Sequence, residues 1–428
     1  MITFVTYFNY AIAIVLTVAY LYQMGYLVIG LIRGRRQNLP DPKALHRYAV
    51  IISARNERNV IGGLIKSLKD QNYPEHLLDI YVVADNCTDD TAAISRRAGA
   101  LVYERFDTVQ VGKGYALDYL FTRLREEGKD SYEGYFVFDA DNYVDPNFVM
   151  EMNRVFDTGK YAAITSYRNS KNFGSNWISA GYGLWFLREA RFLNAPRMFL
   201  GTSCAISGTG FLVSADLIRE NEGWPYHLLT EDIEFSVNCA LHGKCIGYCE
   251  RAVVYDEQPI TFRQSWNQRL RWSKGFYQIN FHYGISLFKG CFQPRRQAFS
   301  CYDMLMTVAP GMLLTLIGIA FNLILLGACL FEPQSVAKAV MEITGSFLVQ
   351  SVVMFYLGLL IYGAATTVVE WKYIQMPNWK KLCYLFTFPL FMFTYVPIAL
   401  VALVRKVEWK PIAHGVDCAT VEDHTLAS

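Results

Sequence analysis

The stretch YFVFDADN, residues 135–142, begins as an apolar run and ends in carboxylates. Two similar apolar runs precede it, RYAVIISARNE at residues 47–57 and LDIYVVAD at residues 78–85. Between the first two, residues 59–71 place apolar side chains on one face at helical spacing. Buried strands that alternate with helices predict an α/β fold in which helices cover both faces of a mainly parallel sheet.

Polar clusters follow each of these expected strands. They are SARNE at residues 53–57, DNCTDD at 85–90 and DADN at 139–142. In open α/β sheets a ligand binds beyond the carboxyl ends of the strands, so these clusters predict the location of a site. The GKG at residues 112–114 is not a Walker A motif, and no GxGxxG follows the first strand. An ATPase or a dinucleotide enzyme is therefore disfavoured.

Four long uncharged runs surround this region, at residues 1–32, 304–331, 343–369 and 382–404. About 20 apolar residues cross a bilayer, so each run is long enough to span one. The first run lacks a basic leading region and is too long for a signal peptide, which predicts a retained anchor. We therefore expect an integral membrane protein.

The charges beside these runs predict its orientation. Cations follow the first run directly, namely Arg33, Arg35, Arg36 and Lys43. This pattern places the next region in the cytoplasm and gives an out–in–out–in order for the spans. Four full spans would then put Arg405, Lys406 and Lys410 outside, although their charge favours the inside. Pro389 and Pro397 interrupt the last run, so a re-entrant or interfacial segment stays open as an alternative.

The expected organisation has five parts. They are an N-terminal transmembrane helix (1–32), a cytoplasmic α/β domain (46–281), an interfacial segment (282–302), a C-terminal transmembrane cluster (303–404) and a tail (405–428). We expect the plasma membrane as the location. The net charge of +2 does not suggest a nucleic-acid partner. The ten cysteines lack paired zinc spacing, so we interpret them as reduced thiols.

The DADN cluster carries two carboxylates, Asp139 and Asp141, which can converge at the end of a strand. Adjacent anions repel each other, and a shared divalent cation would relieve that repulsion. Mg²⁺ or Mn²⁺ prefers a few carboxylates together with phosphate oxygens and water. A solvated turn, in which Asp and Asn are common, explains the pattern equally well.

The stretch LLTEDIEFS, residues 228–236, predicts a helix with Thr230 as its cap. Glu231 and Asp232 would then lie in the first turn, where acidic side chains complement the helix dipole. The alternative is that Asp232 is a general base that takes a proton from a hydroxyl nucleophile.

The stretch QRLRW, residues 268–272, places Gln268, Arg271 and Trp272 on one helical face, while Arg269 points elsewhere. An Arg can pair with a phosphate and a Trp can stack on a sugar. A basic helix that reaches toward lipid headgroups is the alternative. We expect Arg269 and Lys274 to contact headgroups or solvent. Residues 175–192 carry an aromatic stripe that we interpret as core or interface, with a polymer channel as the alternative.

Together, these motifs resemble those of the membrane-embedded, inverting glycosyltransferases of family 2, the group of cellulose, chitin and hyaluronan synthases. The resemblance covers residues 50–277 and implies a GT-A-type α/β fold for the cytoplasmic domain (46–281). SARNE and VADNCTDDT look like the nucleotide-binding segments, DADN like the DxD motif, TED (230–232) like the base motif and QRLRW like QxxRW. Residues 233–267 form an interval of 35 residues between Asp232 and Gln268, as in the processive members.

The resemblance implies a role for each matching residue. Asp232 would be the catalytic base, and Asp139 and Asp141 would hold Mg²⁺ or Mn²⁺. The donor would contact Ala54, Glu57, Asp85, Lys113, Asp139, Gln268, Arg271 and Trp272. The acceptor would contact Gly208, Thr209, Gly210, Glu231 and Trp272. The Gly-Thr-Gly of SGTGF (207–211) replaces the Phe-Cys-Gly of cellulose synthases, which argues against cellulose.

The reaction implied by the resemblance is transfer of a sugar from a UDP-sugar, UDP-GlcNAc or UDP-Glc, to a growing polysaccharide. Transfer of a single sugar to a membrane lipid is the alternative within enzymes. A transporter or membrane scaffold is the alternative from another class. The near absence of ionisable residues within the apolar runs disfavours it, because transport pathways normally need them.

Overall fold

The computed structural model describes residues 2–33, 39–308, 310–407 and 414. An eight-stranded sheet forms its centre, with the strand order β3-β2-β1-β4-β7-β6-β8-β5. The strands are β1 (Tyr48–Ala54), β2 (Leu78–Asp85), β3 (Leu101–Arg105), β4 (Gly134–Asp139), β5 (Tyr143–Val144), β6 (Ala163–Ser170), β7 (Phe211–Ser214) and β8 (Ile246–Asp256). The predicted α/β fold of GT-A type is confirmed.

The sheet is mixed rather than mainly parallel. Strands β3, β2, β1 and β4 run parallel, as do β6 and β8, whereas β7 pairs antiparallel with both β4 and β6. The parallel register places Ser53 beside Asp139, and Ala54 beside Ala84. The three polar clusters predicted from the sequence therefore meet at one edge of the sheet.

Successive residues of the central strands enter two separate cores. Ala49 and Ile51 belong to one hydrophobic cluster, while Val50 and Ile52 belong to the other. Because both faces are covered, these strands carry apolar side chains on both faces. The second cluster contains residues of α3 (Ile61–Lys69) and α6 (Phe148–Phe156), and α4 (Thr91–Arg97) packs against α3. The first contains residues of α5 (Lys113–Glu126), α7 (Trp177–Glu189), α9 (Ala215–Glu220) and α10 (Glu231–Leu241).

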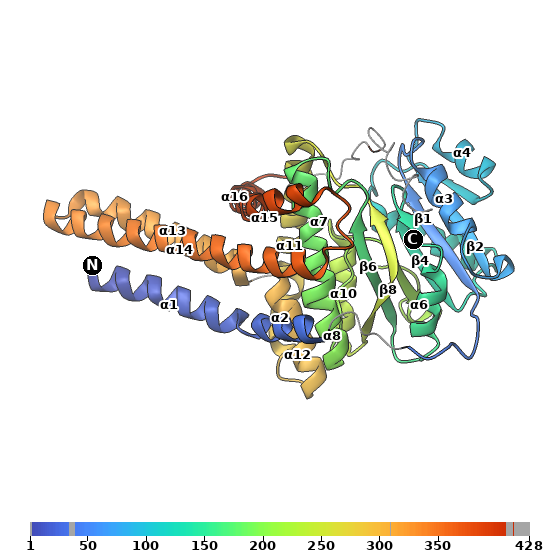
Figure 1. Cartoon of the computed structure of the whole chain (residues 1–428), viewed down its shortest axis with the longest axis horizontal. Helices are drawn as coiled ribbons and strands as arrows, with labels where there is room; N and C mark the ends of the chain where they lie inside the picture. The colour runs from blue at the N-terminus through green and yellow to red at the C-terminus, as the bar shows by residue number, and fades with distance from the viewer. Residues whose placement is uncertain (1, 34–38, 309, 408–413, 415–428) are drawn as a thin grey trace.

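A layer of helices separates the sheet from a group of long helices that project away from it (Figure 1). The layer contains α7, α8 (Ala195–Leu200), α11 (Phe262–Gly290) and α12 (Arg295–Val308), and a π-turn at Ala190–Asn194 joins α7 to α8. The projecting helices are α1 (Ile2–Tyr20), α13 (Pro310–Ala328) and α14 (Gln334–Val369). Helix α11 continues through the domain boundary that we expected at residue 281. Short 3₁₀ turns occupy Glu75–Leu77 and Cys329–Phe331.

Four helical stretches in the described residues are long and apolar enough to cross a membrane. They are Ile2–Arg33, Leu313–Phe331, Gln334–Val369 and Asn378–Val404. The first includes α2 (Tyr22–Arg33), and the last consists of α15 (Asn378–Phe393) and α16 (Tyr395–Val404). Two of these stretches are joined by polar side chains. The side-chain amides of Asn9 in α1 and Asn322 in α13 form two hydrogen bonds with each other, at 2.8 and 3.1 Å.

The expectation that Arg269 and Lys274 contact headgroups or solvent is wrong. Arg269 is fully buried, and its Nη1 donates to Phe391 O at 3.1 Å and Thr394 Oγ1 at 2.6 Å. Lys274 Nζ donates to Ala402 O at 3.1 Å. The last carbonyls of a helix lack intrahelical donors, and these two cations satisfy carbonyls near the ends of α15 and α16.

Candidate active site

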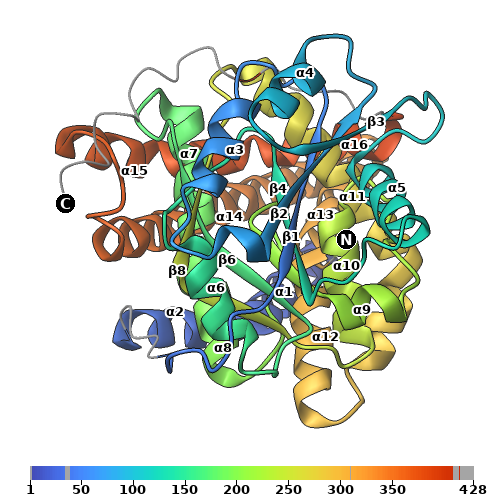
Figure 2. The same cartoon turned by 90° about the vertical axis from the view of Figure 1, so that its right-hand side faces the viewer.

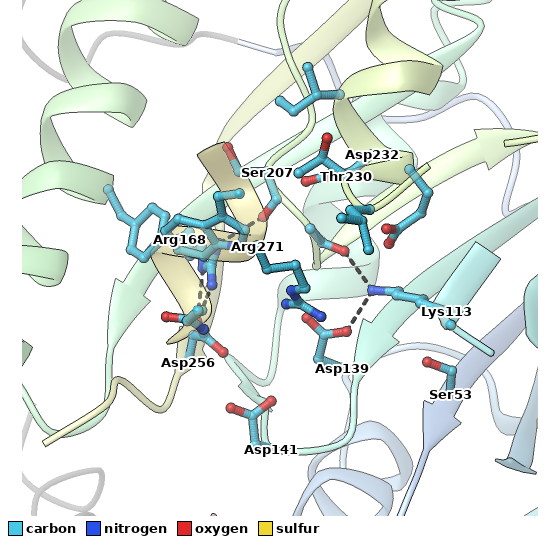
Figure 3. A pocket seen from close by; sticks show the side chains of 18 of the residues that line it. Ser53, Lys113, Asp139, Asp141, Arg168, Ser207, Thr230, Asp232, Asp256 and Arg271 are labelled. Atoms are coloured by element: carbon cyan, nitrogen blue, oxygen red, sulfur yellow. Dashed lines mark hydrogen bonds and ion pairs between the residues drawn. The ribbon is translucent and has the colours of Figure 1, made fainter. Parts of the chain in front are cut away.

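A cavity of about 280 Å³ opens at the carboxyl ends of β1, β2 and β4 (Figure 3). Most of the residues that the resemblance singled out line it, although they come from separate elements. They are Ala54, Glu57, Asp85, Lys113, Asp139, Asp141, Gly208, Glu231, Asp232, Gln268, Arg271 and Trp272. The fold therefore brings the donor, base and metal candidates into one space.

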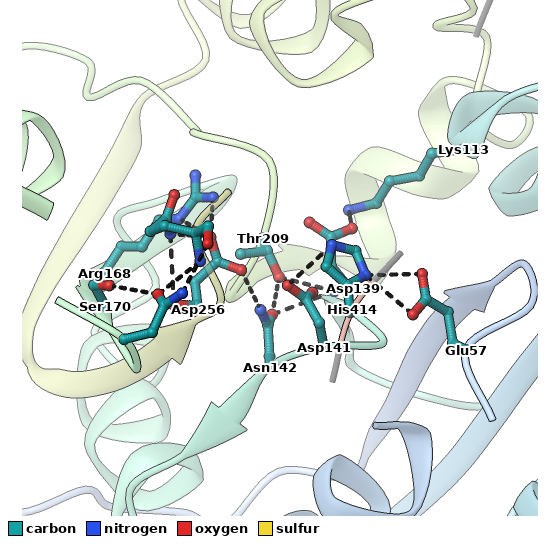
Figure 4. Close-up of polar contacts among 12 residues, drawn as sticks. Glu57, Lys113, Asp139, Asp141, Asn142, Arg168, Ser170, Thr209, Asp256 and His414 are labelled. Atoms are coloured by element: carbon teal, nitrogen blue, oxygen red, sulfur yellow. Dashed lines mark hydrogen bonds and ion pairs between the residues drawn. The ribbon is translucent and has the colours of Figure 1, made fainter. Parts of the chain in front are cut away.

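Lys113 connects three of the predicted motifs. It begins α5 after Gly112, and its Nζ donates to Asp139 Oδ1 and to Gly208 O, both at 2.6 Å (Figures 3 and 4). Burial alone would lower the pKa of Lys113, but the carboxylates around it, led by Asp139, raise that pKa. Lys113 is therefore a stable cation at the point where GKG, DADN and SGTGF meet.

Thr209 and Gly210, which the resemblance assigned to the acceptor, do not line this cavity. The Thr209 hydroxyl accepts from the backbone N–H of Asp139 at 2.9 Å and bonds the side-chain oxygen of Asn142. Gly210 has a φ of +65°, and a Cβ there would lie 2.7 Å from Ser166 Oγ. Through these contacts, both residues help to fix the conformation of the loop. Of the three loop residues assigned to the acceptor, Gly208 lines the cavity, and a Cβ on it would lie within 3.9 Å of Asp232, Arg168 and Asp139.

Glu231 and Asp232 lie in the first turn of α10, as the sequence predicted. Burial raises the pKa of both carboxyl groups, and Lys113 opposes that rise. The predicted Thr230 cap does not form, and Thr230 Oγ1 is buried without a hydrogen-bond partner among the described residues. Gly275 of α11 packs directly against this hydroxyl.

One face of α11 contributes Gln268, Arg271 and Trp272 to the cavity. Trp272 packs edge-on against Tyr182 and Phe186 of α7, with ring centroids 5.8 and 6.4 Å away. Gln268 Oε1 is buried and has no hydrogen-bond partner in the described part of the chain. Buried polar atoms are nearly always paired, so this oxygen is available to a ligand hydroxyl.

Arg168 and Asp256 belong to the site, although the sequence analysis did not identify them. The Nε of Arg168 donates to Asp256 at 3.0 Å, its Nη2 makes a second bond to the same carboxylate, and its Nη1 donates to Ser207 O at 2.8 Å. The guanidinium also lies 3.7 Å from the Phe186 ring centroid. Both residues lie near the carboxyl ends of parallel strands β6 and β8, which is the only sequence signal that could have identified them.

His414 also lines the cavity, and nothing in the sequence pattern indicated it. Its Nδ1 lies 3.0 and 3.1 Å from the two Glu57 carboxylate oxygens, and its Nε2 lies 3.8 Å from Asp141 (Figure 4). Burial would lower the pKa of His414, but Asp141 and the hydrogen bond to Glu57 raise it to about 10. The tail therefore adds a cation to the site.

We expect His414→Ala to weaken binding of a nucleoside diphosphate about tenfold, because one cation among many carboxylates is lost. Calorimetric titration of the purified protein with UDP measures this affinity. The matched control is His242→Ala, since His242 is exposed just after the end of α10. Unchanged or tighter UDP binding in His414→Ala would show that the tail does not support the nucleotide.

The two DADN carboxylates fit a divalent cation. The described residues contain no group of three or more His, Cys, Asp and Glu side chains that could hold a metal by themselves. Asp141 is buried, and its pKa is raised by that burial and by the nearby Asp256 and Asp139 charges. A buried carboxylate with a disfavoured charge gains most from a cation. Asp139 and Asp141 would supply two ligands, and the diphosphate would supply the others.

This arrangement, a GT-A sheet with a DxD-type pair, a helix-borne carboxylate and a cation-lined cavity, defines the class of nucleotide-sugar glycosyltransferases. The chain belongs to the family described as Glycosyltransferase like family 2, which matches residues 46–275. The resemblance inferred from the motifs is therefore confirmed at the level of the family.

Two curated relatives differ in what their names say they make. The chain is 25% identical to beta-monoglucosyldiacylglycerol synthase of Synechocystis sp., over 58% of this chain and 50% of that protein. It is also 25% identical to poly-beta-1,6-N-acetyl-D-glucosamine synthase of Staphylococcus epidermidis, over 54% of each. The chain spans about half the length of these relatives.

Among solved structures, the fold is similar to that of the mannosyltransferase PcManGT from Pyrobaculum calidifontis, solved with GDP-Man and Mn²⁺. The TM-score is 0.56 at 17% identity, over 92% of this chain and 99% of that one. At this identity the likeness establishes the GT-A fold, and the nearly complete coverage includes the helices around it.

Proposed function

We propose that the protein transfers a sugar from a nucleotide diphosphate sugar to a hydroxyl acceptor at a membrane, with inversion at the anomeric carbon. The observation that supports this most strongly is the convergence of Asp232, the Lys113–Asp139 pair and the α11 face on one cavity. A UDP-sugar is the proposed donor, with UDP-GlcNAc and UDP-Glc first. The names of two relatives in the family, a glucolipid synthase and a poly-GlcNAc synthase, support these two sugars.

The donor would lie along the strand ends. Ala54, Glu57 and Asp85 line the part of the cavity formed by β1 and β2, where the base and ribose would bind. Asp85 is buried beside Arg105, whose Nη1 donates to it at 2.7 Å, so its carboxylate is held in one orientation. The diphosphate would lie between Arg271 and Lys113, and an Arg can bind two phosphate oxygens at once.

In the proposed reaction, Asp232 takes the proton from the acceptor hydroxyl as its oxygen attacks the anomeric carbon. A new glycosidic bond forms there, the bond to the diphosphate oxygen breaks on the opposite face, and the nucleoside diphosphate leaves. Lys113 and Arg271 stabilise the charge on that leaving group. A divalent cation, when bound, would neutralise part of the same charge. No covalent enzyme intermediate is needed.

The acceptor is proposed to be a growing polysaccharide or a lipid. The 35-residue interval before QRLRW favours the polymer. The far end of the cavity favours a lipid, because Leu193, Phe276 and Thr307 line it and Thr307 belongs to α12, just before α13. This region carries apolar side chains and approaches the membrane-spanning helices.

One experiment tests both the reaction and the acceptor. Protein in lipid vesicles is incubated with Mn²⁺ and each radiolabelled UDP-sugar, then UDP release and product partition are measured. No UDP release with any donor, in the presence of lipid and glycan acceptors, would refute glycosyl transfer. A ladder of water-soluble products indicates a polymer, and one labelled product in the organic phase indicates a lipid acceptor.

Replacement of Asp141 tests the proposed cation site. We expect Asp141→Ala to reduce the Mn²⁺-dependent gain in UDP affinity by about tenfold or more, because one of two carboxylate ligands is lost. Calorimetry with and without Mn²⁺ measures this gain. Asp118→Ala is a control, since Asp118 carries a half-exposed carboxylate on α5 outside the cavity lining. An unchanged Mn²⁺ effect in Asp141→Ala would argue against metal ligation.

We also propose that the catalytic domain faces the cytoplasm and that the membrane is the plasma membrane. The cations that follow the first apolar stretch support the cytoplasmic side. The cysteines in the described ranges form no disulfide with one another, which fits thiols in a reducing compartment.

A further inference from the structure

The last apolar stretch, α15–α16, does not follow the direction of the other three candidate spans. In Figure 1, α1, α13 and α14 extend together along the long axis, while α16 is viewed almost end-on. In Figure 2, α15 and α16 stretch across the molecule. The share of buried residues is also different, with 39% for Asn378–Val404 against 6 to 17% for the other three.

Helix α16 lies alongside the catalytic helix α11. Tyr277 Oη donates to Ala399 O at 3.0 Å, and Leu270 of α11 packs with Ile398 and Ala402 of α16. Lys274 adds the contact to Ala402 described above. Since the opposite face of α11 lines the cavity, α16 is only one helix away from the proposed chemistry.

Helix α15 is equally bound to the catalytic domain. The Phe391 ring packs on Gly181 of α7, where an added Cβ would lie 2.5 Å from that ring. Lys380 Nζ donates to Gly174 O at 3.1 Å, and Asn169 of β6 donates to Tyr373 O, just before α15, at 3.0 Å. The segment from Tyr373 to the end of α16 therefore packs against the catalytic domain.

The outward face of α15–α16 is apolar and exposed. Its side chains are between 40 and 87% exposed, and they are Trp379, Leu382, Phe386, Leu390, Leu400, Leu403 and Val404. On α15 they recur at helical spacing, as expected for an amphipathic helix that lies on a bilayer. Arg405 and Lys406, both exposed, follow this apolar face directly, where they can meet lipid headgroups.

The position of His414 argues against a crossing. His414 lies in the cavity, and only ten chain positions separate it from Val404. Ten extended residues reach at most about 36 Å, whereas the hydrocarbon core alone is about 30 Å thick. If α15–α16 crossed the membrane, the chain after Val404 would have to cross back to bring His414 into the cavity. Nearly all of those ten residues would then lie in hydrocarbon, including the charged Arg405 and Lys406.

We infer that α15–α16 lies flat in the membrane–water interface on the catalytic side, with its exposed apolar face against the acyl chains. Three of the four candidate spans then cross the membrane, and His414 stays on the side of the active site. This arrangement removes the conflict between four spans and the charges after the last one, because Arg405 and Lys406 lie where positive charge is favoured.

Depth measurements on spin labels distinguish the two topologies. Leu382, Phe386, Leu390 and Leu403 are each replaced by Cys and labelled in proteoliposomes, after Cys383 and the other accessible thiols are changed to Ser. An in-plane segment places all four labels at one shallow depth, about 5–10 Å below the headgroups. A spanning helix would separate positions 382 and 403 by about 32 Å, with a label near the bilayer centre.

Helix α14 provides the control. Labels at Met341, Leu348 and Phe355, all exposed on α14, should differ in depth by about 21 Å from first to last. A C-terminal tag in sealed vesicles should be accessible on the same side as the catalytic domain, and UDP release verifies that each variant is folded. A depth gradient along α15–α16, labels shielded from lipid, or a tag on the opposite side would overturn the inference.

Discussion

Asp232→Asn is expected to reduce sugar transfer by about a thousandfold, within the range that removal of a general base produces. The amide has nearly the same shape as the carboxylate but cannot accept the acceptor proton. UDP affinity should change little, because the proposed diphosphate contacts come from Lys113, Arg271 and the DADN carboxylates. Single-turnover transfer and calorimetric UDP binding, measured on the same preparation, separate these two quantities.

Glu231→Gln is the matched control for Asp232. Both carboxyl groups are buried in the same turn of α10, and both have a raised pKa. We expect Glu231→Gln to retain more activity, since acceptor positioning is its proposed role. If Glu231→Gln is inactive while Asp232→Asn retains normal turnover, then Glu231 is the base.

The same assignment predicts a pH dependence. A base acts only when deprotonated, and burial raises the pKa of Asp232 above its usual 3.8. Transfer should therefore fall as the pH drops through that raised value, and this decline should begin at a higher pH than for an exposed Asp. A rate that stays constant down to pH 4 would contradict a buried carboxylate base.

The sequence predicted the part of the fold that depends on local patterns. Val50 and Phe136 belong to uninterrupted apolar strands, and such strands require cover on both faces, which the structure provides. Asp139 and Glu57 follow strand ends, so parallel register alone was enough to bring them together. The sequence did not predict that β7 pairs antiparallel with β4 and β6, because no local pattern shows the direction in which a strand joins the sheet.

Other features depend on contacts between distant parts of the chain. Arg269 was placed at headgroups or solvent because it lies off the catalytic face, but its partners include the Phe391 carbonyl and the Thr394 hydroxyl, more than a hundred residues away. His414 reaches Glu57 across 357 positions. The in-plane direction of α15–α16 cannot be read from composition, since an interfacial pair docked on protein can be as apolar as a span.

A buried ion pair joins the catalytic domain to the membrane region, and its removal should have the largest effect on stability. Arg197 of α8 bonds Asp303 of α12 at 2.6 and 2.9 Å, and both side chains are 1% exposed. The hydroxyls of Tyr22 and Tyr26, from α2, donate to the same carboxylate at 2.9 and 2.8 Å. Three elements that are distant in sequence therefore meet at Asp303.

Arg197→Met should destabilise the protein by about 3–5 kcal/mol, because it leaves the Asp303 charge buried without its cation. For a domain of this size that corresponds to a fall of roughly 10 °C in the unfolding midpoint, measured in detergent by intrinsic fluorescence. Arg123→Met, which removes a surface pair with Glu126, should leave the midpoint within about 2 °C.

The double variant Arg197→Met/Asp303→Leu separates the cost of a stranded charge from the value of the pair. If the loss in Arg197→Met comes from burying an unpaired carboxylate, then replacing Asp303 as well should recover much of the midpoint. Recovery should be incomplete, because Tyr22 and Tyr26 lose their acceptor when Asp303 becomes Leu. A double variant no more stable than Arg197→Met would show instead that the Arg197 contacts themselves hold α8 against the membrane helices.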